Sequence, residues 1–352
     1  MNELKISSTE AAILCEQKQP LIVSEITLPE QLAVGQVLVE VNYSGICGSQ
    51  IGEIDGVKGP DKYLPHLLGH EGSGKVLQIG PGVSTLQVDD HVVIHWKQGT
   101  GINASTPKYQ WDNKSVNAGW VTSFNKHAII SENRLTKIPS TVDLKIAALY
   151  GCAVTTGFGV VLNDAELKPG QSLVVYGAGG IGLNIIQAAK MVSSLPIVAI
   201  DLYDNKLALA KELGADYVIN AKNENVSEKV KEYVPEGVDV VIDNTGNPEI
   251  IAQSYDMTKP DGKTVLVGVP KAGNKTSIFT LPLHFGKQLK GSFGGGTLPQ
   301  TDIPKYLKLY DAGRYELEPL ISNTFSLKNI NDAIASMRDG SAYGRCIIDM
   351  SL

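Results

Sequence analysis

The chain has 352 residues, of which 43% are hydrophobic and 19% are charged, and its formal net charge is −6. This length exceeds what one hydrophobic core normally serves, so we expect two domains. Because no stretch concentrates Lys or Arg, we expect no nucleic-acid partner. No apolar run approaches the roughly 18 residues of a membrane span, and the first residues lack the layout of a secretory signal. We therefore expect a cytoplasmic protein that contacts neither nucleic acid nor membrane.

The four cysteines, Cys15, Cys47, Cys152 and Cys346, are widely scattered. In a long chain without an export signal, this spacing argues against a disulfide framework. We expect reduced thiols or metal ligands instead.

The first part of the chain is rich in short apolar runs separated by Gly, Pro and Asp. These runs predict strands at residues 11–14, 21–23, 37–43, 74–79 and 91–95. They indicate an irregular, mostly antiparallel domain. Residues 96–119 are polar and poor in aliphatic side chains, so we expect a long loop there, of the kind that is functional or mobile.

From about residue 145 the pattern changes to alternating strands and helices. Strands are predicted at residues 173–176, 197–200, 217–220, 238–243, 263–268 and 288–293. Helices are predicted at 144–150, 155–162, 205–213, 225–233 and 248–257, and the tail adds helices at 303–311 and 330–337 and a strand at 344–348. Strands joined by helical crossovers indicate an α/β fold with a doubly wound parallel sheet.

A glycine-rich turn follows the strand at residues 173–176 and leads directly into a helix. This G-x-G-x-x-G pattern, between a strand and a helix, is typical of a dinucleotide site. Gly177 permits the tight turn, Gly179 lets the backbone approach a pyrophosphate, and Gly182 lets the helix pack closely on the strand. The helix N-terminus then offers free N–H groups to the phosphates.

Asp201 ends the next predicted strand, at the expected interval of about 20 residues after the last glycine. A carboxylate there accepts hydrogen bonds from a free ribose 2′-hydroxyl and repels a 2′-phosphate, so NAD is favoured over NADP. The alternative is an acid at a helix N-terminus or an ordinary surface acid.

Metal-ligand residue types stand in three glycine-rich settings, as Cys47, His70 and Cys152. Two thiolates and one imidazole are the donors of a catalytic zinc site, which leaves a fourth position for water or substrate. Their long spacings match no local zinc motif. Taken singly, Cys152 could be a small buried core residue and His70 a hydrogen-bonded structural histidine.

Four motifs in order, Gly45-Ile-Cys-Gly-Ser, Gly69-His-Glu-Gly, Gly151-Cys with Thr-Thr-Gly, and Val-Val-Tyr-Gly-Ala-Gly-Gly-Ile-Gly, span most of the chain. Together they resemble the zinc-dependent alcohol dehydrogenase family of medium-chain dehydrogenases/reductases, in particular its polyol (sorbitol) dehydrogenase-like members. The resemblance implies a GroES-like, mainly β catalytic domain formed by residues 1–153 and 293–352. It also implies a Rossmann NAD-binding domain at residues 154–292.

The resemblance further implies one catalytic zinc held by Cys47, His70 and Cys152. Ser49 would bond the substrate hydroxyl and begin the proton relay, Glu71 would lie behind the metal, and Thr156 would flank the nicotinamide. The cofactor residues that it implies are Gly177, Gly179, Gly180, Ile181, Gly182, Asp201, Lys206, Val269, Phe293 and Arg345, the last at the pyrophosphate.

Three departures from the family pattern concern the metal and the proton relay. Residues 95–130 contain no cysteine, so we expect no structural zinc. Gln50 stands where the family usually has an Asp that orients the zinc-bound His. Ile51-Gly52 stands where a relay His is common, which leaves His66, His95 or solvent as the outer proton acceptor.

These residues predict an oxidoreductase that transfers a hydride between NAD(H) and a small alcohol or carbonyl substrate. Trp96 either lines the substrate pocket or is a core aromatic, and the polar residues 97–119 favour a polyol or sugar-derived alcohol. The alternatives are a zinc-free NADPH-dependent quinone or enoyl reductase and a non-catalytic nucleotide-binding protein. The resemblance implies a homo-oligomer, either a dimer or a tetramer.

Overall fold

The computed structural model describes residues 4–352, which form two compact units. The first unit comprises the described residues up to Cys152, Leu298–Leu307 and Ile321–Leu352; the second comprises Ala153–Thr297 and Lys308–Leu320. The chain therefore returns to the first unit twice. The stretch Lys308–Leu320, which the sequence placed in the catalytic domain, joins the second unit. Gln187 fastens it there, because its amide donates to the Glu316 carbonyl and accepts from the Glu316 N–H, both at 2.9 Å.

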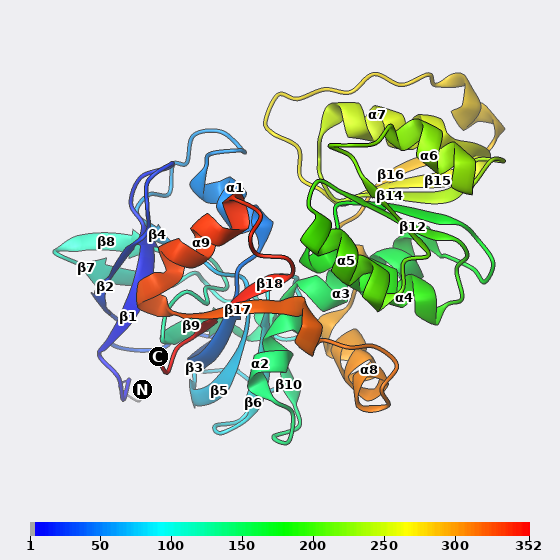
Figure 1. The fold of residues 1–352 in the computed structure, drawn as a ribbon. Coiled ribbons are helices and arrows are strands. Elements are labelled where there is room, and N and C mark those ends of the chain that lie inside the picture. The colour runs from blue at the N-terminus through cyan, green and yellow to red at the C-terminus, as the bar shows by residue number, and fades with distance from the viewer. Residues whose placement is uncertain (1–3) are drawn as a thin grey trace. The chain divides into compact units, whose positions relative to one another are not determined.

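The first unit contains a closed barrel and a larger sheet (Figure 1). The barrel order is β1(Ser8–Leu14), β2(Ile22–Thr27), β7(Lys108–Trp111), β8(Lys114–Asn117) and β4(His66–Leu67). The sheet order is β10(Leu135–Ile138), β6(His91–His95), β5(Glu71–Ile79), β3(Gln36–Gly45), β18(Arg345–Asp349) and β17(Ile321–Ser326), and β9(His127–Ser131) also pairs with β3. This unit also contains the helices α1(Gly48–Ile54), α2(Leu144–Ala147) and α9(Ile330–Arg338), and most of α8(Pro299–Asp311), whose last residues belong to the second unit. The prediction of a mainly β domain is confirmed.

The prediction of a loop over residues 96–119 was wrong for residues 108–117, which form the hairpin β7–β8. Tyr109 and Val116 are opposite each other in this hairpin and both are fully buried, while their neighbours along the strands are polar. Asp112 and Asn113 form the turn with positive φ angles of 46° and 61°, as a two-residue hairpin of the primed type requires. Each of these two strands has only four residues and one buried side chain, so the alternation of apolar and polar residues is too short to be recognised in the sequence.

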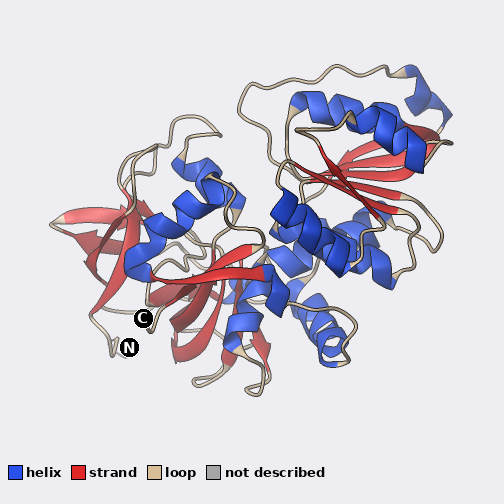
Figure 2. Cartoon of the chain, in the orientation of Figure 1, coloured by secondary structure: helices blue, strands red, loops and turns tan. Residues whose placement is uncertain are grey.

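The second unit is built on a parallel sheet in the order β13(Tyr217–Asn220), β12(Ile197–Asp201), β11(Leu173–Tyr176), β14(Val238–Asp243), β15(Thr258–Leu266), β16(Gln288–Gly291). Its helices include α3(Ala153–Gly159), α4(Gly180–Met191), α5(Asp204–Leu213), α6(Val226–Tyr233) and α7(Pro248–Met257). Helices cover both faces of this sheet (Figure 2). The strand order reverses between β11 and β14, which is where doubly wound sheets bind ligands. The predicted α/β fold class is confirmed.

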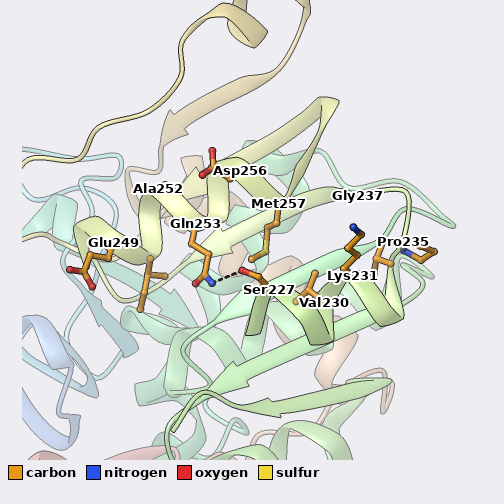
Figure 3. A pocket seen from close by; sticks show the side chains of 12 residues that line it. Ser227, Val230, Lys231, Pro235, Gly237, Glu249, Ala252, Gln253, Asp256 and Met257 are labelled. Carbon is orange, nitrogen blue, oxygen red and sulfur yellow. Dashed lines mark hydrogen bonds between the residues drawn. The ribbon is translucent and has the colours of Figure 1, made fainter. Parts of the chain in front are cut away.

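A groove of about 850 Å³ lies between α6 and α7 in the second unit (Figure 3). Ser227 and Gln253 face each other across it, and the Gln253 amide donates to the Ser227 hydroxyl at 2.8 Å. None of the predicted zinc, cofactor or catalytic residues lines this groove.

The helical stretch from residue 144 to 165 is interrupted at Cys152, whose backbone leaves the helical region with φ −150° and ψ −61°. Among the described residues no single helix is long and apolar enough to cross a membrane. Taken together, the two helical segments Leu144–Gly151 and Ala153–Ala165 would be long and apolar enough, but they are bent by 51° at Cys152. Most of this pair is buried inside the protein. The interruption places the Cys152 thiol at a break between helices.

Candidate active site

Three sequence-distant segments of the first unit bring Cys47, His70 and Cys152 together. Cys47 precedes α1, His70 connects β4 to β5, and Cys152 follows the 3-10 turn Ala148–Gly151. One ligand atom from each residue lies within 4.8 Å of the other two. The Sγ atoms of Cys47 and Cys152 are 3.9 Å apart.

The donor set fits a zinc ion. The Nε2 atom of His70 is buried and has no hydrogen-bond partner among the described residues. A buried polar atom without a partner is costly, and a metal ion would satisfy it. Two thiols and one imidazole leave a fourth coordination position, as catalytic zinc sites do.

The charges within the cluster are unevenly shared. The hydrogen bond with Cys152, helped by the Arg345 guanidinium, holds the pKa of the Cys47 thiol well below its ordinary value. The same hydrogen bond, together with burial, raises the pKa of the Cys152 thiol well above its ordinary value. Burial lowers the pKa of His70, but the hydrogen bond and charge of Cys47 and the charge of Glu71 together raise it, so that the net shift is upward. The hydrogen bond between the two sulfurs and the nearby Arg345 cation therefore favour a thiolate within this cluster.

Glu71 and Arg345 form a buried ion pair next to this cluster. Glu71 is fully buried at the start of β5, directly after His70, and its Oε1 lies 2.9 Å from the Nε of Arg345. The Arg345 Nη1 donates to the carbonyl of Ile46, the residue before Cys47. The nearby Glu71 carboxylate raises the pKa of Arg345 in spite of its burial. This pair fastens the segments that carry two of the three candidate ligands.

Gln50 links the same two segments through the backbone. Its Oε1 accepts a hydrogen bond from the Gly69 N–H, and its Nε2 donates to Glu53 at 3.2 Å. The amide thus holds the chain just before His70. Ser49, its neighbour on α1, is half-buried.

The two histidines named as outer proton acceptors are both engaged. His95 donates from Nδ1 to the Lys97 carbonyl at 2.7 Å and accepts at Nε2 from Thr136 at 2.9 Å, and burial lowers its pKa to about 4. His66 donates to the Leu67 carbonyl at 2.9 Å and pairs with Asp61 at 2.7 Å. His95 is therefore neutral and structural near pH 7.

The glycine fingerprint lies where β11 meets α4 in the second unit. Gly177 has a φ of +87°, which favours glycine. A Cβ on Gly182 would lie 1.9 Å from the Gly177 carbonyl oxygen, so only glycine fits there. A Cβ on Gly179 would meet nothing within 4 Å, so the space beside it is open. Gly180 and Ile181 begin α4.

Asp201 ends β12, and its carboxylate holds the fingerprint loop. Its Oδ2 accepts from the Ala178 N–H at 2.8 Å and its Oδ1 accepts from the Leu202 N–H at 2.7 Å. Lys206 lies on α5 with its ammonium 4.8 Å from the centre of the Tyr203 ring.

The other predicted cofactor residues are spread over the second unit. Thr156 is buried in α3, whereas Val269 and Phe293, after β15 and β16, are 54% and 70% exposed. In the first unit, Trp96 follows β6 and is half-buried.

Arg134 is a residue at this end of β6 that the sequence reasoning missed. Its Nη1 donates to the Trp96 carbonyl at 2.9 Å. A lone arginine among Glu132-Asn-Arg-Leu has no motif around it, and only the fold brings it to Trp96.

Comparisons with known proteins identify the family. Residues 33–140 match the "Alcohol dehydrogenase GroES-like domain" model, and residues 180–312 match "Zinc-binding dehydrogenase". The S-(hydroxymethyl)glutathione dehydrogenases of Synechocystis sp. and Paracoccus denitrificans are both 30% identical; the alignments cover 95% and 97% of this chain and 98% and 99% of those proteins. The structure of benzyl alcohol dehydrogenase from Acinetobacter calcoaceticus matches with a TM-score of 0.88 and 29% identity, over 98% of this chain and 99% of that one. The chain belongs to the zinc-dependent alcohol dehydrogenase family, whose cofactors are zinc and NAD.

Proposed function

We propose that this protein is an NAD-linked alcohol dehydrogenase with one catalytic zinc bound by Cys47, His70 and Cys152. The convergence of these three donors in the first unit is the observation that carries the proposal. It argues against a zinc-free quinone or enoyl reductase, which would have no use for two thiols and an imidazole at one point. No structural zinc is proposed, because residues 95–130 contain no cysteine.

When bound, zinc supplies a Lewis acid that polarises the substrate oxygen, and NAD supplies the hydride acceptor. The chain's own residues hold and orient the reactants. Ser49, two residues after Cys47 on α1, accepts the proton of the substrate hydroxyl at its Oγ and passes it outward. Glu71 and Arg345 keep the ligand segments in place through their ion pair.

The second unit would serve as the NAD-binding domain, and the first as the catalytic domain. The open space beside Gly179 suits a pyrophosphate, and the N–H groups of Gly180 and Ile181 at the start of α4 suit its negative charge. Asp201 would accept the adenosine ribose hydroxyls, with Lys206 nearby. Thr156, Val269 and Phe293 would flank the nicotinamide, and Arg345 would reach the pyrophosphate.

The substrate is an alcohol or its carbonyl counterpart, with Trp96 lining the pocket. The preference for a polyol or sugar-derived alcohol stays a prediction from the polar stretch at residues 97–119. The names of relatives point elsewhere, since they act on S-(hydroxymethyl)glutathione or benzyl alcohol. All three kinds of alcohol belong in the first substrate screen.

Metal analysis combined with steady-state kinetics tests the proposal. The purified protein should contain about one zinc per chain, and Cys47→Ser should lose both the metal and nearly all turnover. Cys346→Ser, which changes a buried cysteine outside the cluster, is the matched control and should keep its zinc. Turnover should require NAD and fall strongly with NADP. Activity that survives without zinc, or a preference for NADPH, would contradict the proposal.

We also propose that copies of the chain associate through the edge strand β16. It is the last strand of its sheet, so one side of its backbone is unpaired in the single chain. Phe279, Leu281 and Phe285, in the segment before it, are 66%, 51% and 75% exposed. Phe285→Asp should convert an oligomer into a smaller species in light scattering, whereas Tyr63→Asp, an exposed aromatic of the first unit, should not. A wild type that is monomeric throughout would refute this interface.

A further inference from the structure

Arg134 is a buried cation without a counter-ion. It ends the 3-10 turn Glu132–Arg134 and is only 8% exposed. Its Nη1 donates to the Trp96 carbonyl, but its Nε is enclosed without a hydrogen-bond partner, and no carboxylate within the described residues 4–352 lies within ion-pair distance of it. Burial lowers its pKa, and no acidic group offsets that effect. A buried charge is normally paired, because an isolated one is costly.

The acid nearest in sequence cannot serve as the missing counter-ion. Glu132 uses both carboxylate oxygens on other groups: the backbone N–H groups of Ser84, Thr85 and Ile102 donate to it at 2.7–2.9 Å. The other buried arginine, Arg345, has its own acid, Glu71.

Arg134 binds the backbone just after β6, the strand that packs against the segments of two candidate zinc ligands. Trp96, whose carbonyl it binds, is two residues after Ile94. The Ile94 carbonyl oxygen would be only 2.2 Å from a Cβ on Gly151, the residue before Cys152. His95 pairs in register with Glu71, the residue after His70. The backbone that Arg134 holds is therefore continuous with the backbone that packs against two of the ligands.

A partly exposed aromatic ring lies next to this cation. The guanidinium carbon of Arg134 is 5.6 Å from the centre of the Trp120 ring, and Trp120 is 45% exposed. A guanidinium on the face of a tryptophan can still donate a charge-assisted hydrogen bond to a carboxylate or phosphate.

We propose that Arg134 selects substrates: the preferred alcohol or aldehyde carries an anionic group, a carboxylate or a phosphate, that pairs with this guanidinium while its hydroxyl reaches the zinc. The inference rests on the proposed alcohol dehydrogenase function and names its substrate class. A neutral polyol would leave the charge of Arg134 uncompensated, whereas an anionic substrate supplies the missing partner. Arg134 then acts on binding and orientation and does not take part in hydride transfer.

Kinetics on pairs of alcohols that differ in one charge test this assignment. Benzyl alcohol pairs with 4-(hydroxymethyl)benzoate, and glycerol with glycerol 3-phosphate; the two pairs distinguish carboxylate from phosphate. A hydrogen-bonded charge pair contributes about 1.5–3 kcal/mol, which corresponds to about 10- to 150-fold. We expect Arg134→Gln to raise the KM of the anionic member of one pair by such a factor while the neutral member changes by less than about threefold. Arg134→Lys should lose less, and the exposed Arg314→Gln should match the wild type.

Two results would overturn the assignment: equal losses on both members of each pair, or a wild type that does not distinguish them. A binding titration separates this outcome from failure of the proposed function. Quenching of tryptophan fluorescence by 4-(hydroxymethyl)benzoate or glycerol 3-phosphate should saturate in the wild type, weaken with added salt and disappear in Arg134→Gln. If no alcohol is oxidised but this pattern holds, the proposed function fails and the anion site stands. If Arg134→Gln does not fold, Arg134→Lys is read in the same titration.

Discussion

Glu132 is the buried acid that fastens two loops of the first unit, and replacing it offers a sharp test of the fold. The Ser84 N–H, the Thr85 N–H and the Thr85 hydroxyl donate to its Oε1 at 2.8–2.9 Å, and the Ile102 N–H donates to its Oε2 at 2.7 Å. The side chain is fully buried. Glu132→Gln keeps the size but removes the charge and places an NH₂ group where one oxygen now accepts.

The cost of this change follows from the contacts. In the variant, the amide oxygen can still accept from Ser84 and Thr85, whereas the NH₂ group faces the Ile102 N–H, donor against donor. Losing a hydrogen bond to a charged group costs about 1.5–3 kcal/mol, and a buried unsatisfied donor costs about 1–3 kcal/mol. We therefore expect the free energy of unfolding of the first unit to fall by about 3–5 kcal/mol at pH 7.

The effect should also depend on pH. Burial would raise the pKa of Glu132, but hydrogen bonds from the backbone of Ile102, Thr85 and Ser84 hold it below its ordinary value. The ionised carboxylate thus stabilises the fold fully above the unfolded pKa of about 4.3, and this contribution is lost as the pH falls through the lower folded pKa. The difference between wild type and variant should be constant from pH 7 to 5 and smaller at pH 3.5.

Urea unfolding followed by tryptophan fluorescence measures this difference. All three tryptophans, Trp96, Trp111 and Trp120, lie in the first unit, so the signal reports on that unit. Glu16→Gln, which changes an exposed glutamate of the same unit, should be neutral. A variant within about 0.5 kcal/mol of the wild type at pH 7, or a difference that does not shrink in acid, would refute the reasoning.

Two further predictions concern the fingerprint and a buried histidine. Gly182→Ala should abolish NADH binding measured by calorimetry, because its Cβ would lie 1.9 Å from the Gly177 carbonyl oxygen. The control variant Gly119→Ala, whose Cβ would have no neighbour closer than 3.5 Å, should bind NADH as the wild type does. Equal affinities of the two variants would contradict the packing argument. Burial lowers the pKa of His95 to about 4, so its neutral form stabilises the fold above pH 6.5 and about 3 kcal/mol is lost as the pH falls from 6.5 to 4. His95→Gln should flatten that part of the stability curve in urea titrations, and an unchanged slope would show that His95 does not titrate as the structure implies.

Local pattern was enough to predict the second unit well. Apolar runs such as residues 173–176 and 238–243 are buried on both faces, as a parallel sheet requires, and they read clearly in the sequence. The close approach of Gly182 to the fingerprint strand was also anticipated, since only glycine permits it. Hydrophobic periodicity and the steric requirement for glycine act between residues close in sequence, so a single segment is enough to predict these features.

The sequence was less informative where a role depends on distant partners. The strand β17 was missed, because its residues are half-buried and lack a clear alternation. The Glu71–Arg345 pair joins residues far apart in the chain, so no spacing rule announces it. Gln50 was recognised only as a departure from the family's Asp, and the structure shows that its amide oxygen accepts from the Gly69 N–H. Such contacts depend on tertiary geometry, which residue types alone do not fix.

The order in which strands enter the first unit's sheet has a consequence for synthesis. β18 lies between β3 and β17, and it carries Arg345, the partner of Glu71. A ribosome therefore completes every residue of the second unit, up to Leu320, before either β17 or β18 exists. Until β18 is synthesised, β3 lacks a partner on one side at residues 43–45 and Glu71 has no arginine, and an unpaired strand edge favours aggregation of nascent chains. The second unit can fold during translation, whereas the first unit's sheet must wait for β17 and β18.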